Sequence, residues 1–188
     1  MRVIAGEAGG VPLTAPPGRT TRPTSDLVKG AMFSVLGDAG CSGRVLDLYA
    51  GSGALGIEAL SRGADFCDFV EKDAAACKTI EANLQKTRLG DRARVHRLPA
   101  GRFVAAATAA YDLILIDPPY ALPEVDELLA HVGRSALIHS ETTLVLEHSS
   151  RRPPAPLAGL LALEKSRTHG DTAFSVYTVA GAEAGTPG

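Results

Sequence analysis

The stretch from Arg44 to Gly56, RVLDLYAGSGALG, limits the possible folds of this chain more than any other. Its apolar residues Val45, Leu46 and Leu48 predict a buried strand, and an apolar-periodic run from Ala54 to Arg62 predicts a helix. Three glycines between them fit the pattern G-x-G-x-x-G; they are Gly51, Gly53 and Gly56. Such glycines allow a sharp turn, close approach of the backbone to a ligand, and tight packing of helix on strand. The stretch therefore predicts a strand, a ligand-binding loop and a helix.

A carboxylate follows the next apolar run, which extends from Phe66 to Val70. Glu71 lies fifteen residues after Gly56, at the end of this second predicted strand. A carboxylate in this position can accept two hydrogen bonds from a ribose diol. The glycine loop and Glu71 together predict a cofactor that contains adenosine. The alternative is a glycine cluster that only packs a helix on a strand.

A second carboxylate narrows the choice of adenosine cofactor. Asp47 lies within the first predicted strand, four residues before Gly51. A negative charge beside a pyrophosphate is unfavourable, whereas it suits the sulfonium and ammonium groups of S-adenosylmethionine. We therefore expect S-adenosylmethionine, with the glycine loop holding its amino-acid part.

Predicted strands alternate with predicted helices after the glycine loop, which favours an α/β fold with a doubly wound sheet. Further helices are expected at 24–36, 74–88, 101–110 and 124–132, further strands at 95–98, 111–117 and 142–147, and a terminal hairpin at 160–179. Ligands of such sheets bind beyond the carboxyl ends of the strands, where Gly51, Glu71 and Asp117 all fall. These three positions should therefore converge on one edge of the sheet.

Length and composition favour one globular domain, because 45% of the 188 residues are hydrophobic and 21% are charged. Residues 1–36 are expected to form an N-terminal extension on the substrate side, with a short hairpin near 2–5 and 11–13. Residues 37–180 are expected to form the cofactor-binding domain, and residues 181–188 a disordered tail.

The overall charge gives no general attraction to nucleic acid. The formal net charge is -2 and the pI is about 6.2, so a nucleic-acid partner requires a local basic patch. Arg19, Arg22 and Lys29 form such a patch near the N-terminus. They are expected on a helix face that is either solvated or in contact with phosphate.

The cysteines and the absence of long apolar runs indicate the compartment. Cys41, Cys67 and Cys77 lack metal-ligand spacing and predict reduced thiols in the core, which fits a reducing cytoplasm. The N-terminus does not resemble a signal peptide, and no apolar run has membrane-spanning length. We expect a soluble, cytoplasmic protein with no metal and no membrane partner.

The tetrapeptide from Asp117 to Tyr120, DPPY, follows a short and almost wholly apolar strand. The two prolines remove two backbone donors and hold the chain extended, so carbonyl groups remain available as acceptors. If Asp117 and the Pro118 carbonyl accept both hydrogens of an exocyclic nucleobase amine, its nitrogen can direct its lone pair at a methyl group. Tyr120 would then stack on the base. The alternative is a rigid turn that ends the strand.

The motifs DPPY and DLYAGSGALGIEALSRGA resemble the S-adenosylmethionine-dependent amino methyltransferases that modify adenine N6 or guanine N2. The opening MRVIAGEAGG and the segment RPTSDLVKGAMFSVL resemble more narrowly the bacterial RsmD family, which methylates the N2 amine of guanine 966 in 16S rRNA. The resemblance covers residues 1 to about 180. It implies a Rossmann-like, mostly parallel sheet of seven strands with an antiparallel last strand. It also implies S-adenosylmethionine as cofactor and 16S rRNA, naked or within the small ribosomal subunit, as partner.

The resemblance also implies the residues of the site. Those expected to be catalytic are Asp117, Pro118, Pro119 and Tyr120. Those expected to contact the substrate are Arg22, Pro23, Thr24 and again Tyr120. Those expected to bind the cofactor are Asp47, Tyr49, Ala50, Gly51, Ser52, Gly53, Gly56, Glu71, Lys72 and Ala100.

This chain departs from the family pattern in two segments. Residues 7–11 replace a stretch that is often basic and aromatic, and residues 98–101 lack the polar residue that many methyltransferases use to read adenine. Phosphate contacts could come from other cations, with a solvated surface as the alternative; the candidates are Arg151, Arg152, Lys165 and Arg167.

Other functions stay open at the level of sequence. The same acceptor geometry would serve adenine N6 in DNA or RNA, or a protein side-chain amide. The glycine pattern with Glu71 would fit an NAD-dependent oxidoreductase, although that function explains neither Asp47 nor DPPY. A cofactor sensor or RNA-binding module would bind the cofactor without turnover.

Overall fold

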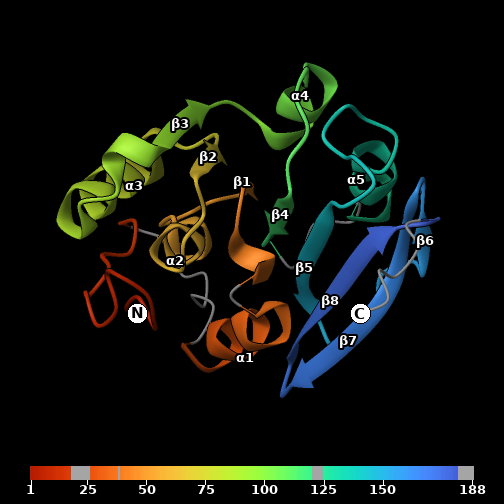
Figure 1. The fold of residues 1–188 in the computed structure, drawn as a ribbon, viewed down its shortest axis with the longest axis horizontal. Helices are drawn as coiled ribbons and strands as arrows, with labels where there is room; N and C mark the ends of the chain where they lie inside the picture. The colour runs from red at the N-terminus through yellow and green to blue at the C-terminus, as the bar shows by residue number, and fades with distance from the viewer. Residues whose placement is uncertain (18–25, 38, 120–124, 182–188) are drawn as a thin grey trace.

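The computed structural model describes residues 1–17, 26–37, 39–119 and 125–181. An eight-stranded sheet with the order β3-β2-β1-β4-β5-β8-β7-β6 runs through its centre (Figure 1). The strands are β1 Arg44–Leu48, β2 Phe66–Glu71, β3 Ala93–Arg97, β4 Leu113–Ile116, β5 Thr143–Ser149, β6 Leu157–Ala158, β7 Leu161–His169 and β8 Thr172–Val179. The strands β1 to β5 are parallel, and β8 is antiparallel to both β5 and β7.

The predicted α/β fold and its closing hairpin are confirmed. The hairpin of β7 and β8 turns at Gly170, whose φ of 65° lies in the left-handed region that glycine tolerates. The resemblance implied seven strands, and β6 is an eighth that the sequence analysis missed. Two residues after a proline-rich stretch give no strand pattern, so only the pairing of β6 with β7 reveals it.

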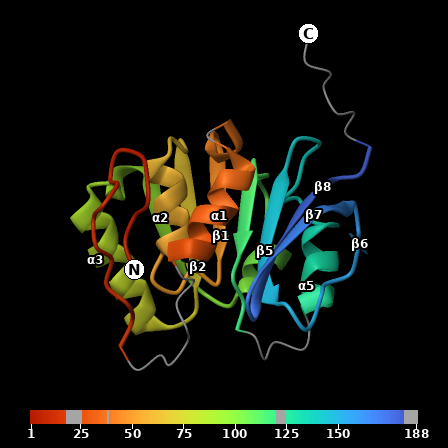
Figure 2. The same ribbon diagram turned by 90° about the horizontal axis from the view of Figure 1, so that it is seen from below.

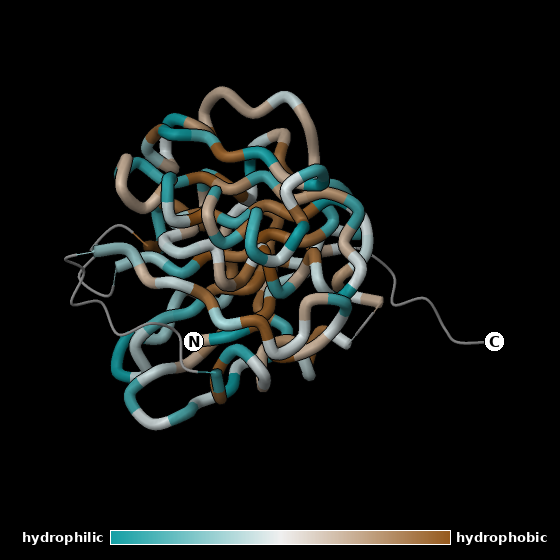
Figure 3. Tube along the Cα trace, turned by 90° about the vertical axis from the view of Figure 1, so that its left-hand side faces the viewer, coloured by the Kyte–Doolittle hydropathy of each residue, from teal (hydrophilic) through white to brown (hydrophobic). Residues whose placement is uncertain are grey.

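Helices cover both faces of the sheet. The α-helices of the described chain are α1 Asp26–Leu36, α2 Ala54–Ser61, α3 Ala74–Thr87, α4 Ala100–Ala105 and α5 Val125–Val132, and short 3₁₀ helices span Ala39–Cys41 and Gly90–Arg92. The helices α1, α2 and α3 lie on one face and α4 and α5 on the other (Figures 1 and 2). Each face has its own apolar cluster, and the brown, hydrophobic part of the chain lies at the centre of Figure 3.

The expected helix at 101–110 ends earlier than predicted. Helix α4 stops at Ala105 and buries only Ala100 and Val104. Short helices gain most of their stability from packing, and the alanines beyond Ala105 have little apolar surface to bury. High helix propensity therefore does not extend α4.

The cysteines are buried, as predicted. Cys41, Cys67 and Cys77 are free thiols in the described chain, and burial raises the pKa of Cys67 and Cys77. Within the described ranges, no helix combines the length and the apolar character that a membrane span requires. Of the predicted disordered tail, residues 182–188 lie outside the described residues.

The N-terminal segment packs into the main core. A bridge between Arg2 and Pro12 closes the expected hairpin, and Figure 2 shows this segment running across α2 and α3. Val3 and Leu13 are buried in the same apolar cluster as Val45 of β1. The extension therefore shares the core of the sheet.

Glu58 of α2 fixes this segment in place. Its fully buried carboxylate accepts hydrogen bonds from the backbone of Ile4 (2.7 Å) and Ala5 (3.1 Å). It also pairs with Lys29 Nζ (3.1 Å) and Arg62 Nε (2.8 Å). Three elements that are distant in sequence thus meet at one carboxylate.

The prediction that Lys29 lies on a solvated or phosphate-contacting face is wrong. Lys29 is 0% exposed, and its ammonium also donates to the Arg2 carbonyl (2.6 Å). Burial lowers the pKa of Lys29, and the nearby Glu58 carboxylate opposes that decrease. The helical pattern of α1 does not reveal this, because the covering segment and the pairing carboxylate come from elsewhere in the chain.

The Glu58→Gln variant tests the importance of this ion cluster. Loss of the negative charge leaves Lys29 and Arg62 without their buried counter-ion, so we expect the free energy of unfolding to fall by about 3–5 kcal/mol. The matched control is Glu7→Gln, which removes an exposed pair with Arg92 and should cost less than about 1 kcal/mol. Urea unfolding measures both, and equal losses would contradict this role of Glu58.

Candidate functional site

The loops after β1 and β2 meet at the carboxyl-terminal edge of the sheet. The Gly51 N–H donates to Glu71 Oε2 (3.0 Å), and the Ala50 N–H donates to the Val70 carbonyl (3.1 Å). The second oxygen of the buried Glu71 carboxylate accepts from the Asp73 N–H (3.0 Å). Charge-assisted bonds of this kind are strong where water is excluded. The structure therefore brings Gly51 and Glu71 together, as the sequence predicts.

The glycine loop is held in left-handed backbone conformations. The φ angle is 62° at Tyr49, 58° at Gly51 and 79° at Gly53. This conformation costs a residue with a side chain about 1–2 kcal/mol, so other contacts must hold Tyr49 there. One contact that fixes the loop comes from α3, where the Asn83 side chain donates to the Ser52 carbonyl (2.9 Å). No sequence pattern indicated this role of Asn83.

Gly56 fixes helix α2 against the sheet. Its N–H donates to Asp47 Oδ2 (2.9 Å), so this buried carboxylate satisfies a free donor in the first turn of α2. A Cβ atom on residue 56 would lie 2.4 Å from Phe69 Cε1 and 2.7 Å from Cys67 Sγ. Helix α2 can therefore approach β2 only because residue 56 has no side chain.

The Gly56→Ala variant tests this close approach. The added methyl group overlaps Phe69 and Cys67, and we expect a loss of about 1–3 kcal/mol in the free energy of unfolding. The control is Gly30→Ala in α1, where nothing lies within 4 Å of the new methyl group. That change should leave stability unchanged or raise it by up to about 1 kcal/mol. A Gly56→Ala protein as stable as the Gly30→Ala protein would contradict the steric argument.

The environment of Asp47 favours its neutral form in the free protein. Burial raises the pKa of Asp47 to about 7. The hydrogen bond from Gly56 opposes this rise, and the nearby Glu71 carboxylate adds to it. The native state therefore binds this proton more tightly than the unfolded chain does. The bound proton therefore stabilises the native state. This contribution to the free energy of unfolding is complete below about pH 4 and is lost as the pH rises through 7.

The Asp47→Asn variant isolates this contribution. It keeps an oxygen acceptor for Gly56 but cannot ionise, so its stability relative to the unsubstituted protein should increase between about pH 4 and 7 and then level off. The upper limit of the change is about 4 kcal/mol, at about 1.4 kcal/mol per pKa unit. Urea unfolding of both proteins at pH 4, 5.5 and 8 measures it. A stability difference that does not vary with pH would contradict the raised pKa of Asp47.

This edge of the sheet fits the cofactor that the sequence predicts. Each carboxylate oxygen can accept more than one hydrogen bond, so Glu71 can hold Gly51 and Asp73 and still accept from ribose hydroxyls. Lys72 is exposed beside Glu71, and Ala100 is buried at the start of α4, after the end of β3. Their contact with a cofactor stays a prediction.

Strand β4 ends at the predicted acceptor motif. The Asp117 N–H points at the Leu48 carbonyl of β1 (3.5 Å), so Asp117 shares an edge with the glycine loop. Asp117 is half-buried, Pro118 is buried and Pro119 is exposed. The remaining predicted residues lie outside the described part of the chain; they are Tyr120, Arg22, Pro23 and Thr24.

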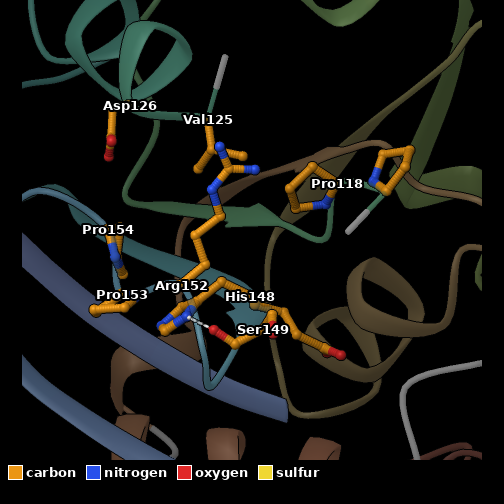
Figure 4. A pocket seen from close by; sticks show the side chains of 10 residues that line it. Pro118, Val125, Asp126, His148, Ser149, Arg152, Pro153 and Pro154 are labelled. Carbon is orange, nitrogen blue, oxygen red and sulfur yellow. Dashed lines mark hydrogen bonds between the residues drawn. The ribbon is translucent and has the colours of Figure 1, made fainter. Parts of the chain in front are cut away.

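A pocket lies beside this motif, between the ends of β4 and β5 and the start of α5 (Figure 4). It encloses about 440 Å³ of space, part of it open to solvent. Its apolar walls are Pro118, Pro119, Val125, Pro153 and Pro154. Its polar groups are Asp126, Glu147, His148, Ser149 and Arg152.

The sequence analysis did not assign Glu147 and His148 to the site. Ile116 pairs with Leu146 in the parallel register, so Asp117, which follows β4, has Glu147 near the end of β5 as its neighbour. The predicted parallel order was the signal that could have identified Glu147, because parallel strands end at the same edge. His148 is buried, its Nε2 lies 2.9 Å from Ser175 Oγ, and burial lowers its pKa.

Comparison with known proteins gives matches along almost the whole chain. The family model described as "Conserved hypothetical protein 95" matches residues 1–178. The protein YlbH of Bacillus subtilis is 38% identical over 180 residues, which cover 94% of this chain and 98% of YlbH. The "Ribosomal RNA small subunit methyltransferase D" of Escherichia coli K12 is 28% identical over 177 residues, which cover 94% of this chain and 89% of that protein.

Solved structures share the fold over the same extent. A hypothetical protein of Thermus thermophilus superposes with a TM-score of 0.82 at 30% identity and covers 95% of this chain and 99% of its own. The Escherichia coli protein yhhF superposes with a TM-score of 0.81 at 28% identity and covers 96% and 98%. The similarity therefore includes the N-terminal segment and the closing hairpin.

Proposed function

This chain belongs to the RsmD family of methyltransferases, and from this premise we propose that it methylates the exocyclic N2 amine of a guanine in 16S rRNA, with S-adenosylmethionine as the methyl donor. The main support for this proposal is the position of Asp117, Pro118 and Pro119. They follow β4 at the same edge of the sheet as the hydrogen bond between Gly51 and Glu71. The relative from Escherichia coli that is named for small-subunit rRNA supports the substrate class.

We propose that the cofactor lies over the ends of β1 and β2. When bound, S-adenosylmethionine supplies an activated methyl group on a positively charged sulfur. Glu71 would accept hydrogen bonds from the ribose, and the backbone of residues 49–53 would hold the amino-acid part. Asp47 holds the first turn of α2, directly after the loop, through Gly56, and a nearby positive charge would favour its ionised form.

The acceptor side would act by positioning the target amine. The Asp117 carboxylate and the Pro118 carbonyl would accept its two hydrogens, and no N–H of residues 118 and 119 competes for these acceptors. The base must leave its stack to reach this edge, which costs least in an unpaired part of the RNA. Stacking by Tyr120 and substrate contacts from Arg22, Pro23 and Thr24 belong to the same proposal.

The remaining assignments are also proposals. Residues 1–36 would contribute to the substrate side, and residues 37–180 would carry the cofactor and acceptor sites. Three buried free thiols suit a reducing cytoplasm, where 16S rRNA is found either naked or in the assembling small subunit.

The test is transfer of a labelled methyl group to small ribosomal subunits that lack their native methylation, followed by identification of the labelled nucleoside. We expect N2-methylguanosine. Asp117→Ala should lower transfer at least about 100-fold, because the amine loses its acceptor, while the affinity for S-adenosylhomocysteine stays within about twofold. Equal loss of transfer and cofactor affinity would contradict the role of Asp117.

The nucleoside also separates the alternatives. Labelled N6-methyladenosine would retain the acceptor mechanism and reject the guanine assignment. A rise in melting temperature with NADH but not with S-adenosylhomocysteine would reject the methyltransferase proposal, because only a ligand of the native state raises it.

A further inference from the structure

We propose that Arg152 selects guanine, by donating hydrogen bonds to O6 and N7 of the target base in the pocket beside Pro118. The inference rests on the proposed function, since it names the residue that would distinguish guanine from adenine at that site. Arg152 lines the pocket together with Pro118, the residue whose carbonyl is proposed to accept from the target amine. An arginine fork on O6 and N7 is the most common specific contact between proteins and guanine.

The loop that carries Arg152 is rigidly held. The Arg152 N–H donates to the Ser149 carbonyl (3.0 Å), and two prolines follow. The next residue, Ala155, donates its N–H to Asp126 Oδ1 (2.9 Å) and accepts at its carbonyl from the Tyr177 hydroxyl (2.8 Å). The loop is thus fixed to α5 on one side and to β8 on the other. Rigid support of this kind lowers the entropy cost of an arginine contact.

The Arg152 side chain extends across the pocket. Figure 4 shows it reaching from the loop toward Val125 and Pro118. None of the ion pairs among the described residues includes Arg152, whereas its neighbour Arg151 pairs with Asp171 (3.1 Å). The two adjacent arginines therefore differ in surroundings, and only Arg152 lines the pocket.

The charges of the pocket favour a neutral base over a phosphate. Asp126 and Glu147 place two carboxylates around it, and burial lowers the pKa of His148 so that this side chain is neutral near pH 7. Among the described lining residues, Arg152 is then the one cation, and a phosphate would meet a net negative surface. Proline and valine walls offer flat apolar surface for a planar ring.

Guanine suits this combination better than adenine does. Guanine presents the donors N1–H and N2–H₂ along one edge and the acceptors O6 and N7 along another. Carboxylates and an arginine can satisfy both edges. Adenine carries an amine at C6 in place of O6, and this donor would face the donors of Arg152. The pocket therefore offers a physical basis for choosing guanine.

The experiment removes the proposed contact from each partner in turn, as N7 of the guanine and as the Arg152 side chain. The probe is a short single-stranded RNA with one central guanine or 7-deazaguanine, which lacks the N7 acceptor but retains N2 and O6. The unsubstituted enzyme should lose about tenfold in kcat/KM with the 7-deaza RNA. Arg152→Ala should lower kcat/KM for the guanine RNA. The kcat/KM values of this variant for the two RNAs should agree within about twofold. The control Arg151→Ala should retain the tenfold preference. Equal preference in the enzyme and its Arg152→Ala variant would overturn the proposal and indicate a phosphate contact or a structural role.

A binding measurement separates this inference from the proposed function. The same RNAs compete with a fluorescent RNA for the protein in the presence of S-adenosylhomocysteine. If no methyl is transferred, an N7-dependent affinity that Arg152→Ala removes would support the guanine contact and reject only the proposed reaction. If the unsubstituted protein does not distinguish the two RNAs in either assay, the guanine contact is wrong even where methyl transfer to small subunits occurs.

Discussion

Buried carboxylates that accept backbone N–H groups hold the glycine loop and its neighbouring elements together. Asp47 joins β1 to α2 through Gly56, and Glu71 joins the loop after β1 to the loop after β2. Hydrogen bonds to buried acceptors are strengthened where water is excluded, and leaving either N–H unpaired there would be costly. These bonds hold the loop on either side of Tyr49, whose left-handed conformation is unfavourable for a tyrosine. The same bonds fix the positions of Gly51 and Gly56.

Glu58, two residues further along α2 than Gly56, is another buried carboxylate that accepts backbone N–H groups. Its carboxylate collects two backbone N–H groups and two cations, and so attaches the N-terminal segment and α1 to the helix that follows the glycine loop. Asn83 adds a polar link between that segment and the loop, because its amide donates to both the Thr14 and the Ser52 carbonyls (2.9 Å each). Asn83 and Glu58 therefore link the N-terminal segment to the glycine loop and to the helix that follows it.

The sequence could predict the parts of this structure that depend on local pattern. The strand, loop and helix at 44–61 follow from apolar spacing and glycines, and the edge that joins Gly51, Glu71 and Asp117 follows from the order of alternating elements. The partners of Lys29 could not be predicted in this way, because they come from residues 2 and 58. The short strand β6 likewise exists only through its pairing with β7.

The pocket beside Pro118 could not be predicted from sequence patterns either. Glu147 lies in an apolar strand and Arg152 in a proline-rich connection, and neither neighbourhood resembles a known motif. They come together with Pro118 because the last residue of β4, Ile116, pairs with Leu146 of β5 and because Asp126 and Tyr177 hold the loop after β5. Apart from Ala100, the proposed cofactor contacts thus lie in the first half of the chain, and the groups proposed to read the base lie in the second. Exchange of residue 152 should therefore alter base preference while the hydrogen bonds of Asp47 and Glu71 remain unchanged, since none of them involves the loop after β5.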